Sequence, residues 1–81
     1  MRITVLFFAH TRDLAGLQRT SIDLPDGATV QQALNEIIRL HPPIATLRGR
    51  IAVAVNERYE TTSATLSDGC TLALIPPVSG G

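Results

Sequence analysis

The last six residues of the chain are the ones whose types and order suggest chemistry. Gly80 and Gly81 have no Cβ atom, so this strip of backbone can enter a slot too narrow for any side chain and leaves the terminal carboxylate unshielded. The proline pair before them fixes φ and offers no N–H for a ladder hydrogen bond, so the segment should leave its sheet at Pro76 and run extended. We predict that Gly81 is the reactive residue; the alternative is a frayed chain end without function. The residues expected to thread Gly81 into a partner are Pro76, Pro77, Val78, Ser79 and Gly80.

Length and charge limit the classes of function. The 81 residues suffice for one small domain that buries about 60–65% of its unfolded surface, and 44% hydrophobic residues indicate a folded chain. The seven basic and seven acidic residues form no cluster along the sequence, so we expect no nucleic-acid or membrane partner. All seven basic residues are arginines, and no lysine is present to form a Schiff base or to accept a chain of modifier proteins.

One cysteine and two distant histidines offer little for metal or thiol chemistry. Cys70 is expected to be a half-buried strand residue, with a reactive thiol as the alternative. His10 and His41 have no cysteine or carboxylate at ligand spacing, so no metal site is expected. The sequence shows neither a leader with a cleavage site nor a long apolar span, and we expect a cytoplasmic protein.

The first part of the chain predicts a hairpin. Residues 2–9 alternate in a way typical of a strand with two partly apolar faces, and residues 18–24 alternate polar and apolar residues as a second strand. Between them we expect a short irregular stretch that ends at Gly16. The hairpin therefore has a long connection.

The central part predicts the main helix. Thr29 and Gln32 have the spacing of a capping box, and apolar residues follow at helical spacing until Pro42-Pro43 ends the helix near His41. The apolar stripe needs a sheet to cover, because a single short amphipathic helix is marginal in water. Its residues are Val30, Ala33, Leu34, Ile37 and Ile38.

The last part predicts three more strands. Residues 51–55 form an apolar strand, Asn56-Glu57 turns the chain, and residues 58–60 form a brief edge strand. Residues 61–65 are expected to be a loop, and residues 71–75 the final strand.

This order of elements predicts an α+β protein with the β-grasp, or ubiquitin-like, fold. We expect a mixed sheet, one main helix packed across one face, and the last strand beside the first. The β-grasp domain should span residues 1–75 and the extended diglycine tail residues 76–81.

Over essentially its whole length, the sequence resembles the small, sulfur-carrier subunits of molybdopterin synthase, members of the ubiquitin-like sulfur carriers. A terminal Gly-Gly is shared by several carriers and modifiers, but Pro-Pro-Val-Ser-Gly-Gly after an apolar strand is far more specific to this family. The matching segments are Val5-Leu6-Phe7-Phe8-Ala9, Arg12 to Gly16, Ala54-Val55-Asn56, Asp68-Gly69 and Leu74 to Gly81.

The resemblance implies a cycle of sulfur transfer. An E1-like adenylating and sulfurating enzyme joins the Gly81 carboxylate to AMP, and sulfur from a donor then replaces AMP to give a thiocarboxylate. The thiocarboxylate enters the large subunit of molybdopterin synthase, in an expected heterotetramer, and delivers sulfur to a cyclic pyranopterin precursor. Two deliveries build the dithiolene of molybdopterin. No permanent cofactor is implied, only the transient AMP adduct and the sulfur on Gly81, and the chain by itself is expected to have no catalytic activity.

The strand faces predict a docking surface. If alternate apolar residues of the first and last strands face the helix, Phe8, Ala73 and Ile75 must point away from it. Tyr59 extends this apolar patch with an aromatic ring that has a polar tip. Because the family docks both partners on its tail-side sheet face, an interface is favoured over a reading in which Phe8 and Tyr59 belong to the core. Arg12 is expected to pair with a partner carboxylate, or else to be solvated. The residues expected to face the helix are Ile3, Val5, Phe7, Leu72 and Leu74.

Two alternatives to this function stay open. The first is a sulfur carrier for another pathway, such as thiamine or cysteine synthesis or tRNA thiolation, because these carriers share the fold and the diglycine. The second is a ubiquitin-like protein modifier, or an interaction domain without chemistry. The sequence assigns no role to residues 42–50 or 61–65.

Overall fold

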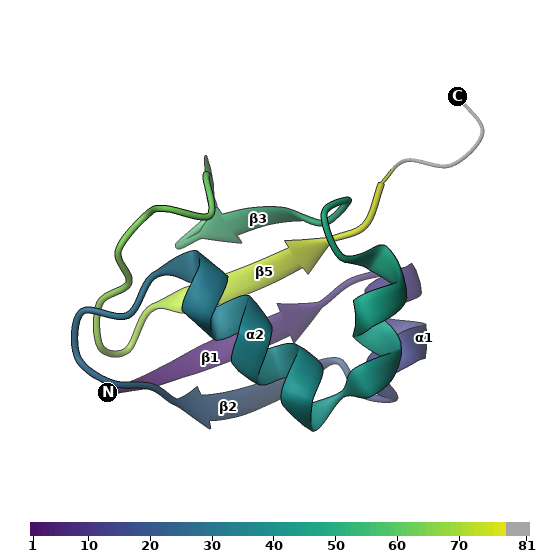
Figure 1. Ribbon diagram of the computed structural model, residues 1–81, viewed down its shortest axis with the longest axis horizontal. Coiled ribbons are helices and arrows are strands. Elements are labelled where there is room, and N and C mark those ends of the chain that lie inside the picture. Colours follow the sequence, from purple (N-terminus) through teal and green to yellow (C-terminus); the bar gives the residue numbers. More distant parts are fainter. Residues whose placement is uncertain (78–81) are drawn as a thin grey trace.

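The computed structural model describes residues 1–77, and the tail residues Val78, Ser79, Gly80 and Gly81 lie outside the described part. Helices lie between the first strands, and the last three strands follow one another along the chain (Figure 1). The elements are β1 (Arg2–Phe7), α1 (His10–Ala15), β2 (Arg19–Asp23), α2 (Val30–Leu40), the 3₁₀ helix η1 (Pro42–Leu47), β3 (Ala52–Val55), β4 (Arg58–Glu60) and β5 (Thr71–Ile75).

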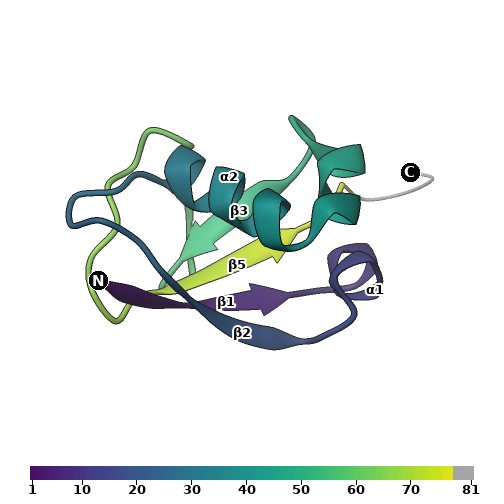
Figure 2. The ribbon, with the colours of Figure 1, turned by 60° about the horizontal axis from the view of Figure 1, so that its bottom comes forward.

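The five strands form one mixed sheet in the order β2-β1-β5-β3-β4. The first and last strands pair in parallel, and every other pairing is antiparallel. Helix α2 crosses one face of the sheet, while α1 lies at the end where β1 finishes (Figure 2). This arrangement confirms the predicted α+β class, with one main helix over one face and the last strand beside the first.

The core lies between α2 and the sheet, and strand alternation explains which residues enter it. Every second residue of β1 and β5 is buried, while the residues between them are partly or fully exposed. The prediction of which strand residues face the helix is therefore confirmed. The buried strand residues are Ile3, Val5, Phe7, Leu72 and Leu74, and the buried residues of α2 are Val30, Ala33, Leu34 and Ile37.

The predicted start of the main helix is also confirmed. The Thr29 N–H donates to Gln32 Oε1 at 2.8 Å, and the Gln32 N–H donates to Thr29 Oγ1 at 3.3 Å. These reciprocal bonds satisfy donors that a helix N-terminus otherwise leaves open. The helix ends at Leu40, and the His41 N–H still donates to the Ile37 carbonyl at 2.7 Å.

Two connections differ from the sequence prediction. The stretch before Gly16 is the helix α1 and not an irregular segment, and Gly16 ends it with a left-handed φ of 79°. A helix of six residues is too short to show a hydrophobic period, and its stability comes from tertiary packing. After α2 the proline pair begins η1, because proline is tolerated in the first turn of a helix. This 3₁₀ helix buries Ile44 and Leu47, so it closes one end of the molecule as part of the packed structure.

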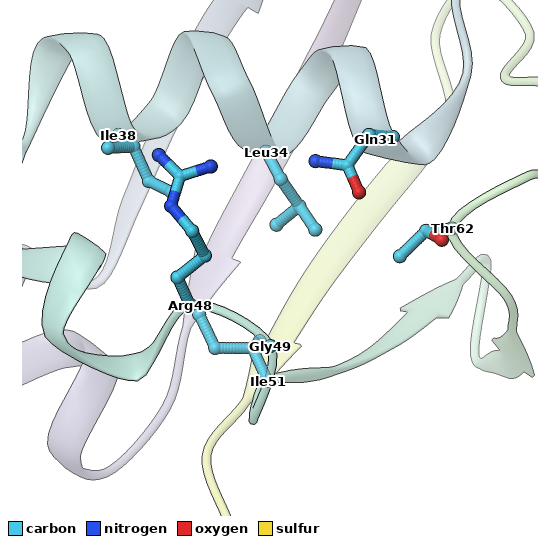
Figure 3. A pocket seen from close by; sticks show the side chains of 7 residues that line it. All are labelled: Gln31, Leu34, Ile38, Arg48, Gly49, Ile51 and Thr62. Atoms are coloured by element: carbon cyan, nitrogen blue, oxygen red, sulfur yellow. The ribbon is translucent and has the colours of Figure 1, made fainter.

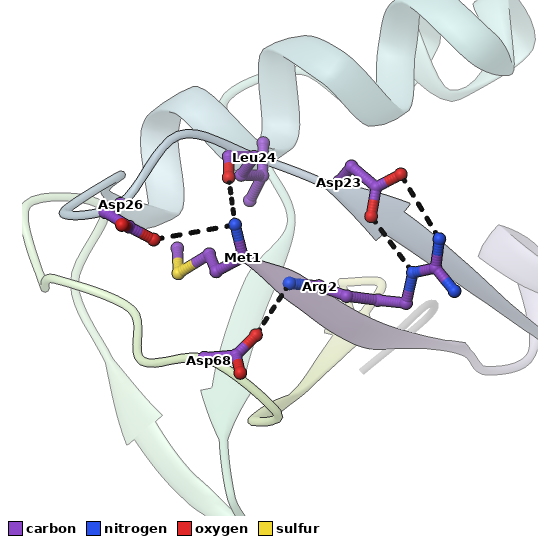
Figure 4. Close-up of polar contacts among 6 residues, drawn as sticks. All are labelled: Met1, Arg2, Asp23, Leu24, Asp26 and Asp68. Atoms are coloured by element: carbon purple, nitrogen blue, oxygen red, sulfur yellow. Dashed lines mark hydrogen bonds and ion pairs between the residues drawn. The ribbon is translucent and has the colours of Figure 1, made fainter.

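Polar contacts fasten the end of the sheet that is remote from the tail (Figure 4). The Met1 amine donates to the Leu24 carbonyl at 2.7 Å and lies 3.5 Å from Asp26, while the Arg2 N–H donates to Asp68 at 2.8 Å. The Arg2 guanidinium donates to the Asp23 carboxylate at 3.0 Å, and this hydrogen bond lowers the pKa of Asp23. Both side chains of this ion pair are solvated, so it adds little stability.

The β3–β4 turn is strained in a way that one substitution should relieve. Val55 pairs with Arg58, so Asn56 and Glu57 form a two-residue loop, and their φ angles are 49° and 71°. Such a loop favours glycine at its second position, because a Cβ there is crowded at positive φ. We expect Glu57→Gly to raise the free energy of unfolding by about 0.5–1 kcal/mol in urea titrations. Glu57→Ala is the control, since it removes the charge but keeps the Cβ. Equal stability of the two variants would contradict the strain argument.

Candidate functional site

The candidate site is the end of the sheet from which the tail departs. As predicted, β5 ends at Ile75, directly before the proline pair. The chain passes η1 as it leaves the sheet, on the side of the molecule where α1 also lies (Figure 1). The predicted reactive residue Gly81 and the threading residues 78–80 lie outside the described residues, so the structure defines the base of the tail, at Pro76 and Pro77.

A buried hydroxyl fixes this base. Thr11 is 0% exposed and is the one buried polar side chain among residues 1–77. Its Oγ1 accepts a hydrogen bond from the Phe8 N–H at 2.9 Å. The hydroxyl also lies within donating distance of two carbonyl oxygens, that of Phe8 at 2.8 Å and that of Leu74 at 3.1 Å. Thr11 therefore ties the end of β1 to the end of β5, two residues before Pro76.

The turn that leads to Thr11 holds an unusual backbone conformation. Ala9 has φ 49° and ψ −122°, the angles of the first central residue of a type II′ turn. The Thr11 N–H closes this turn on the Phe8 carbonyl at 3.0 Å. A residue other than glycine in this region costs on the order of 1–3 kcal/mol and persists only where its surroundings hold it. The hydrogen bonds of the Thr11 hydroxyl to the Phe8 backbone and to the Leu74 carbonyl hold this turn in place.

The sheet face opposite α2 carries an apolar row that runs across four strands. Tyr59 pairs with Ala54, Ala54 with Ala73, and Ala73 with Leu6. Tyr59 is 73% exposed, and Ile75 continues the same face of β5 toward the tail as a half-buried residue. We call this face, together with Phe8, the outer face. Ala54 is buried but stands apart from the main core cluster, as expected for a small residue on this side of the sheet.

Phe8 stands at the tail end of the outer face beside two arginines. It is 47% exposed and, with Arg12 and Arg19, lines a surface hollow of about 430 Å³. The structure thus brings the predicted contact residues Phe8, Arg12 and Ile75 to the tail end of the domain, with Tyr59 farther along the row. Their use as a docking surface stays a prediction, as does an ion pair between Arg12 and a partner.

A larger hollow lies directly against the base of the tail. Its volume is about 830 Å³, and the sequence patterns pointed to none of its polar side chains. Only the fold brings them together, because they come from α1, from η1 and from the segment after η1. The lining residues are Ala9, His10, Thr46, Leu47, Arg50, Pro76 and Pro77.

A third hollow, of about 250 Å³, lies between α2 and the segment that follows η1 (Figure 3). Leu34, Ile38 and Ile51 give it an apolar lining, and the Arg48 side chain extends beside Ile38. Gln31 and Thr62 supply its other polar atoms, and no acid–base pair converges on it.

Metal and thiol chemistry find no support in the described part of the chain. Residues 1–77 hold no group of three or more histidine, cysteine or acidic side chains that could bind a metal ion. Cys70 is 4% exposed and belongs to the core cluster, which favours a structural role over a reactive thiol. Within the same range, no helix has the length and hydrophobicity needed to cross a membrane.

Sequence comparison connects this architecture to a family. The profile of the ThiS family matches residues 5–81. The chain is 38% identical over its full length to the molybdopterin synthase sulfur carrier subunit of Arabidopsis thaliana, covering 84% of that protein. It is 37% identical to the subunit of the same name from Chlamydomonas reinhardtii, with both chains covered completely.

Solved structures of similar proteins have the same fold. SAMP1 from Haloferax volcanii superimposes with a TM-score of 0.91 at 28% identity, with both chains covered completely. A putative subunit 1 of molybdopterin converting factor from Pyrococcus furiosus gives a TM-score of 0.86 at 31% identity, covering 96% of this chain and 99% of that one. A chain of the protein–protein complex of subunits 1 and 2 of molybdopterin-converting factor from Helicobacter pylori gives a TM-score of 0.70 at 26% identity, with full coverage of both chains.

The fold is therefore a ubiquitin-like β-grasp whose last strand leads into a glycine-terminated tail. The chain belongs to the ThiS family, together with the molybdopterin synthase sulfur carrier subunits to which it is similar over its whole length.

The Thr11 hydroxyl provides a stability test of the tail base. Thr11→Val keeps the shape of the side chain but leaves the Phe8 N–H without its side-chain acceptor, so we expect a loss of about 1–3 kcal/mol in the free energy of unfolding. Thr11→Ser retains the hydroxyl, so its free energy of unfolding should fall by less than that of Thr11→Val. Urea titrations of the three proteins compare them directly. A valine variant as stable as the parent, or a serine variant weaker than the valine one, would show that the hydroxyl does not hold this end together.

Proposed function

We propose that this chain is the sulfur carrier subunit of molybdopterin synthase. The observation that carries the proposal is full-length similarity to subunits of that name in a chain whose last strand leads into Pro-Pro-Val-Ser-Gly-Gly. In the proposed cycle the Gly81 carboxylate attacks the α-phosphate of ATP and releases pyrophosphate. A sulfur donor then displaces AMP from the acyl group and leaves a thiocarboxylate. Its sulfur adds to a cyclic pyranopterin precursor, and water releases the carrier as a carboxylate again.

The described residues support a role as a sulfur-donating subunit without catalytic activity of its own. The hollow at the tail base and the hollow beside α2 contain no acid–base pair. Asp23 and Glu36 line another hollow, and a hydrogen bond from an arginine lowers the pKa of each. ATP activation and acid–base work on the pterin would therefore fall to the partner proteins. The chain would carry no permanent cofactor, only a transient AMP adduct and sulfur on Gly81.

Two partners would use the outer face in turn. The related Helicobacter pylori protein is found in a complex of subunits 1 and 2 of molybdopterin-converting factor, which supports a large-subunit partner for this chain. We propose a heterotetramer with that subunit and a separate encounter with the E1-like adenylating enzyme, in the cytoplasm. An exposed Phe8 and Tyr59 suit a surface that must be covered by one partner and then released.

A sulfur carrier of another pathway or a protein modifier is the second candidate. The structural neighbours that support it are SAMP1, the small archaeal modifier protein 1 of Haloferax volcanii, and the BexX/CysO complex from Amycolatopsis orientalis. These neighbours are 27–28% identical to the chain, below the 38% reached by the curated molybdopterin synthase subunit. Molybdopterin synthesis is therefore the favoured pathway.

The first test concerns the free carboxylate. Deleting Gly81, or extending the chain beyond it, should abolish sulfur loading by the adenylating enzyme, ATP and a sulfur donor, because the acyl group is then absent or displaced. Intact mass spectrometry detects loading as the exchange of one oxygen for sulfur. Thermal unfolding is the control and should be nearly unchanged, since a tail adds few packing contacts. Full loading of the extended chain would refute the assignment of Gly81.

The second test concerns the outer face. Phe8→Ala and Ile75→Asp should each weaken binding to both the large subunit and the adenylating enzyme by about 1–3 kcal/mol, the range of a central apolar anchor. Leu40→Ala is the matched control, because Leu40 is exposed to a similar degree (44%) on α2, away from this face. Titration calorimetry measures all four proteins. Simultaneous binding of both partners to one chain, or an equal effect of Leu40→Ala, would contradict a shared outer face.

A further inference from the structure

We propose that the hollow at the tail base is a second contact site, which receives an acidic segment of the protein that encloses the tail. We call it the basal groove, defined by Ala9, His10, Thr46, Leu47, Arg50, Pro76 and Pro77. The inference rests on the proposed function and adds to it a partner surface of stated charge, separate from the outer face.

The position of the groove beside the tail indicates that a protein would occupy it. Pro76 and Pro77 form part of its lining, so any protein that encloses the chain beyond Pro77 must approach the rim of the groove. The opposite walls come from α1 through His10 and from the end of η1 through Thr46 and Leu47. At about 830 Å³, the groove falls in the size range of pockets that hold a small ligand, so it has room for side chains of such a partner.

The chemistry of the groove favours an anionic side chain. Arg50 and His10 both lie in the lining, and no carboxylate does. One guanidinium nitrogen of Arg50 donates to the Thr46 carbonyl at 2.8 Å, which holds the cation against the end of η1. The ion pairs among the described residues engage Arg2, Arg39 and the terminal amine, and none engages Arg50. A carboxylate from a partner would supply the missing counter-charge.

A second basic hollow lies at the tail end of the domain. It contains Phe8, Arg12 and Arg19, and it also has no carboxylate in its lining. The sequence shows no run of basic residues, yet the fold brings Arg12 and Arg19 into this hollow and His10 and Arg50 into the basal groove. A protein whose tail-receiving channel has an acidic rim would be attracted to this end of the molecule and oriented by it.

The test compares charge reversals at two places on the complete chain. Arg50→Glu lies in the basal groove, whereas Arg58→Glu lies on the edge strand β4, opposite Val55, and changes the net charge equally. Association with the large subunit and with the adenylating enzyme of the same organism is followed at about 0.05 M and about 0.5 M salt. Arg50→Gln accompanies them as a milder variant that loses the charge without reversing it, and thermal unfolding shows that each variant is folded.

We expect Arg50→Glu to slow association with at least one partner about tenfold at low salt, Arg50→Gln to have a smaller effect, and Arg58→Glu to have almost none. The difference in association rate between Arg50→Glu and the parent chain should shrink at high salt, because screening weakens the electrostatic attraction. Equal effects of Arg50→Glu and Arg58→Glu, with normal binding of the parent chain, would contradict the basal groove as a contact site but would leave the proposed function unaffected. Unchanged protein binding with lost ATP-dependent loading would identify a nucleotide as the occupant and overturn the protein assignment. If the parent chain bound neither partner, the proposed function would fail together with the groove.

Discussion

The parallel pairing of β1 with β5 is the constraint on which the other features of the molecule depend. It joins the two ends of the sequence at the centre of the sheet, in the register Phe7 to Leu74. That register buries one apolar face of each strand under α2 and turns the other face outward, where Leu6 meets Ala73. It also brings the turn after β1 close to the departure of the tail, so that one buried hydroxyl, that of Thr11, can contact both strand ends. The outer face and the base of the tail at Pro76 are thus placed by the same pairing.

Much of this arrangement could be predicted from the sequence. The alternation in residues 2–7 and 71–75 identifies both the strands and their buried faces, because strand side chains alternate with a period of two. The predicted first strand reaches Ala9, but β1 ends at Phe7, because Phe8 and Ala9 enter the turn that the Thr11 N–H closes. The spacing of Thr29 and Gln32 locates the start of α2, since the capping box is a local interaction. These features depend on neighbours along the chain, and the structure confirms them.

The features that sequence reasoning missed depend on contacts between distant segments. Helix α1 is six residues long and η1 begins with two prolines, so neither shows a hydrophobic period of its own. Thr11 looks like an ordinary polar residue until β5 places the Leu74 carbonyl beside it. The basal groove likewise joins His10 to Arg50 across the tail base, at a sequence separation that no local pattern could bridge. Basic residues form no cluster along the sequence, and only the fold brings Arg12 and Arg19 into one hollow.

The structure describes a compact domain that ends at the base of the tail, and the proposed function assigns the chemistry to the tail. The domain buries its one cysteine, shows no catalytic constellation in residues 1–77 and keeps large apolar side chains on an open face. Such a body is suited to presenting a chain end to other proteins. The similar proteins are named molybdopterin synthase sulfur carrier subunits, and the proposed chemistry of the chain end rests on that similarity.

The most direct test of this account is a transfer measurement with the chain already loaded as a thiocarboxylate. The loaded chain is mixed with the molybdopterin synthase large subunit and the cyclic pyranopterin precursor, and both molybdopterin and unloaded carrier are quantified. The account predicts that molybdopterin forms only when the loaded chain is present and that two carriers return to the carboxylate for each dithiolene made. Sulfur that stays on the carrier under these conditions, but passes to the acceptor of another pathway, would contradict it.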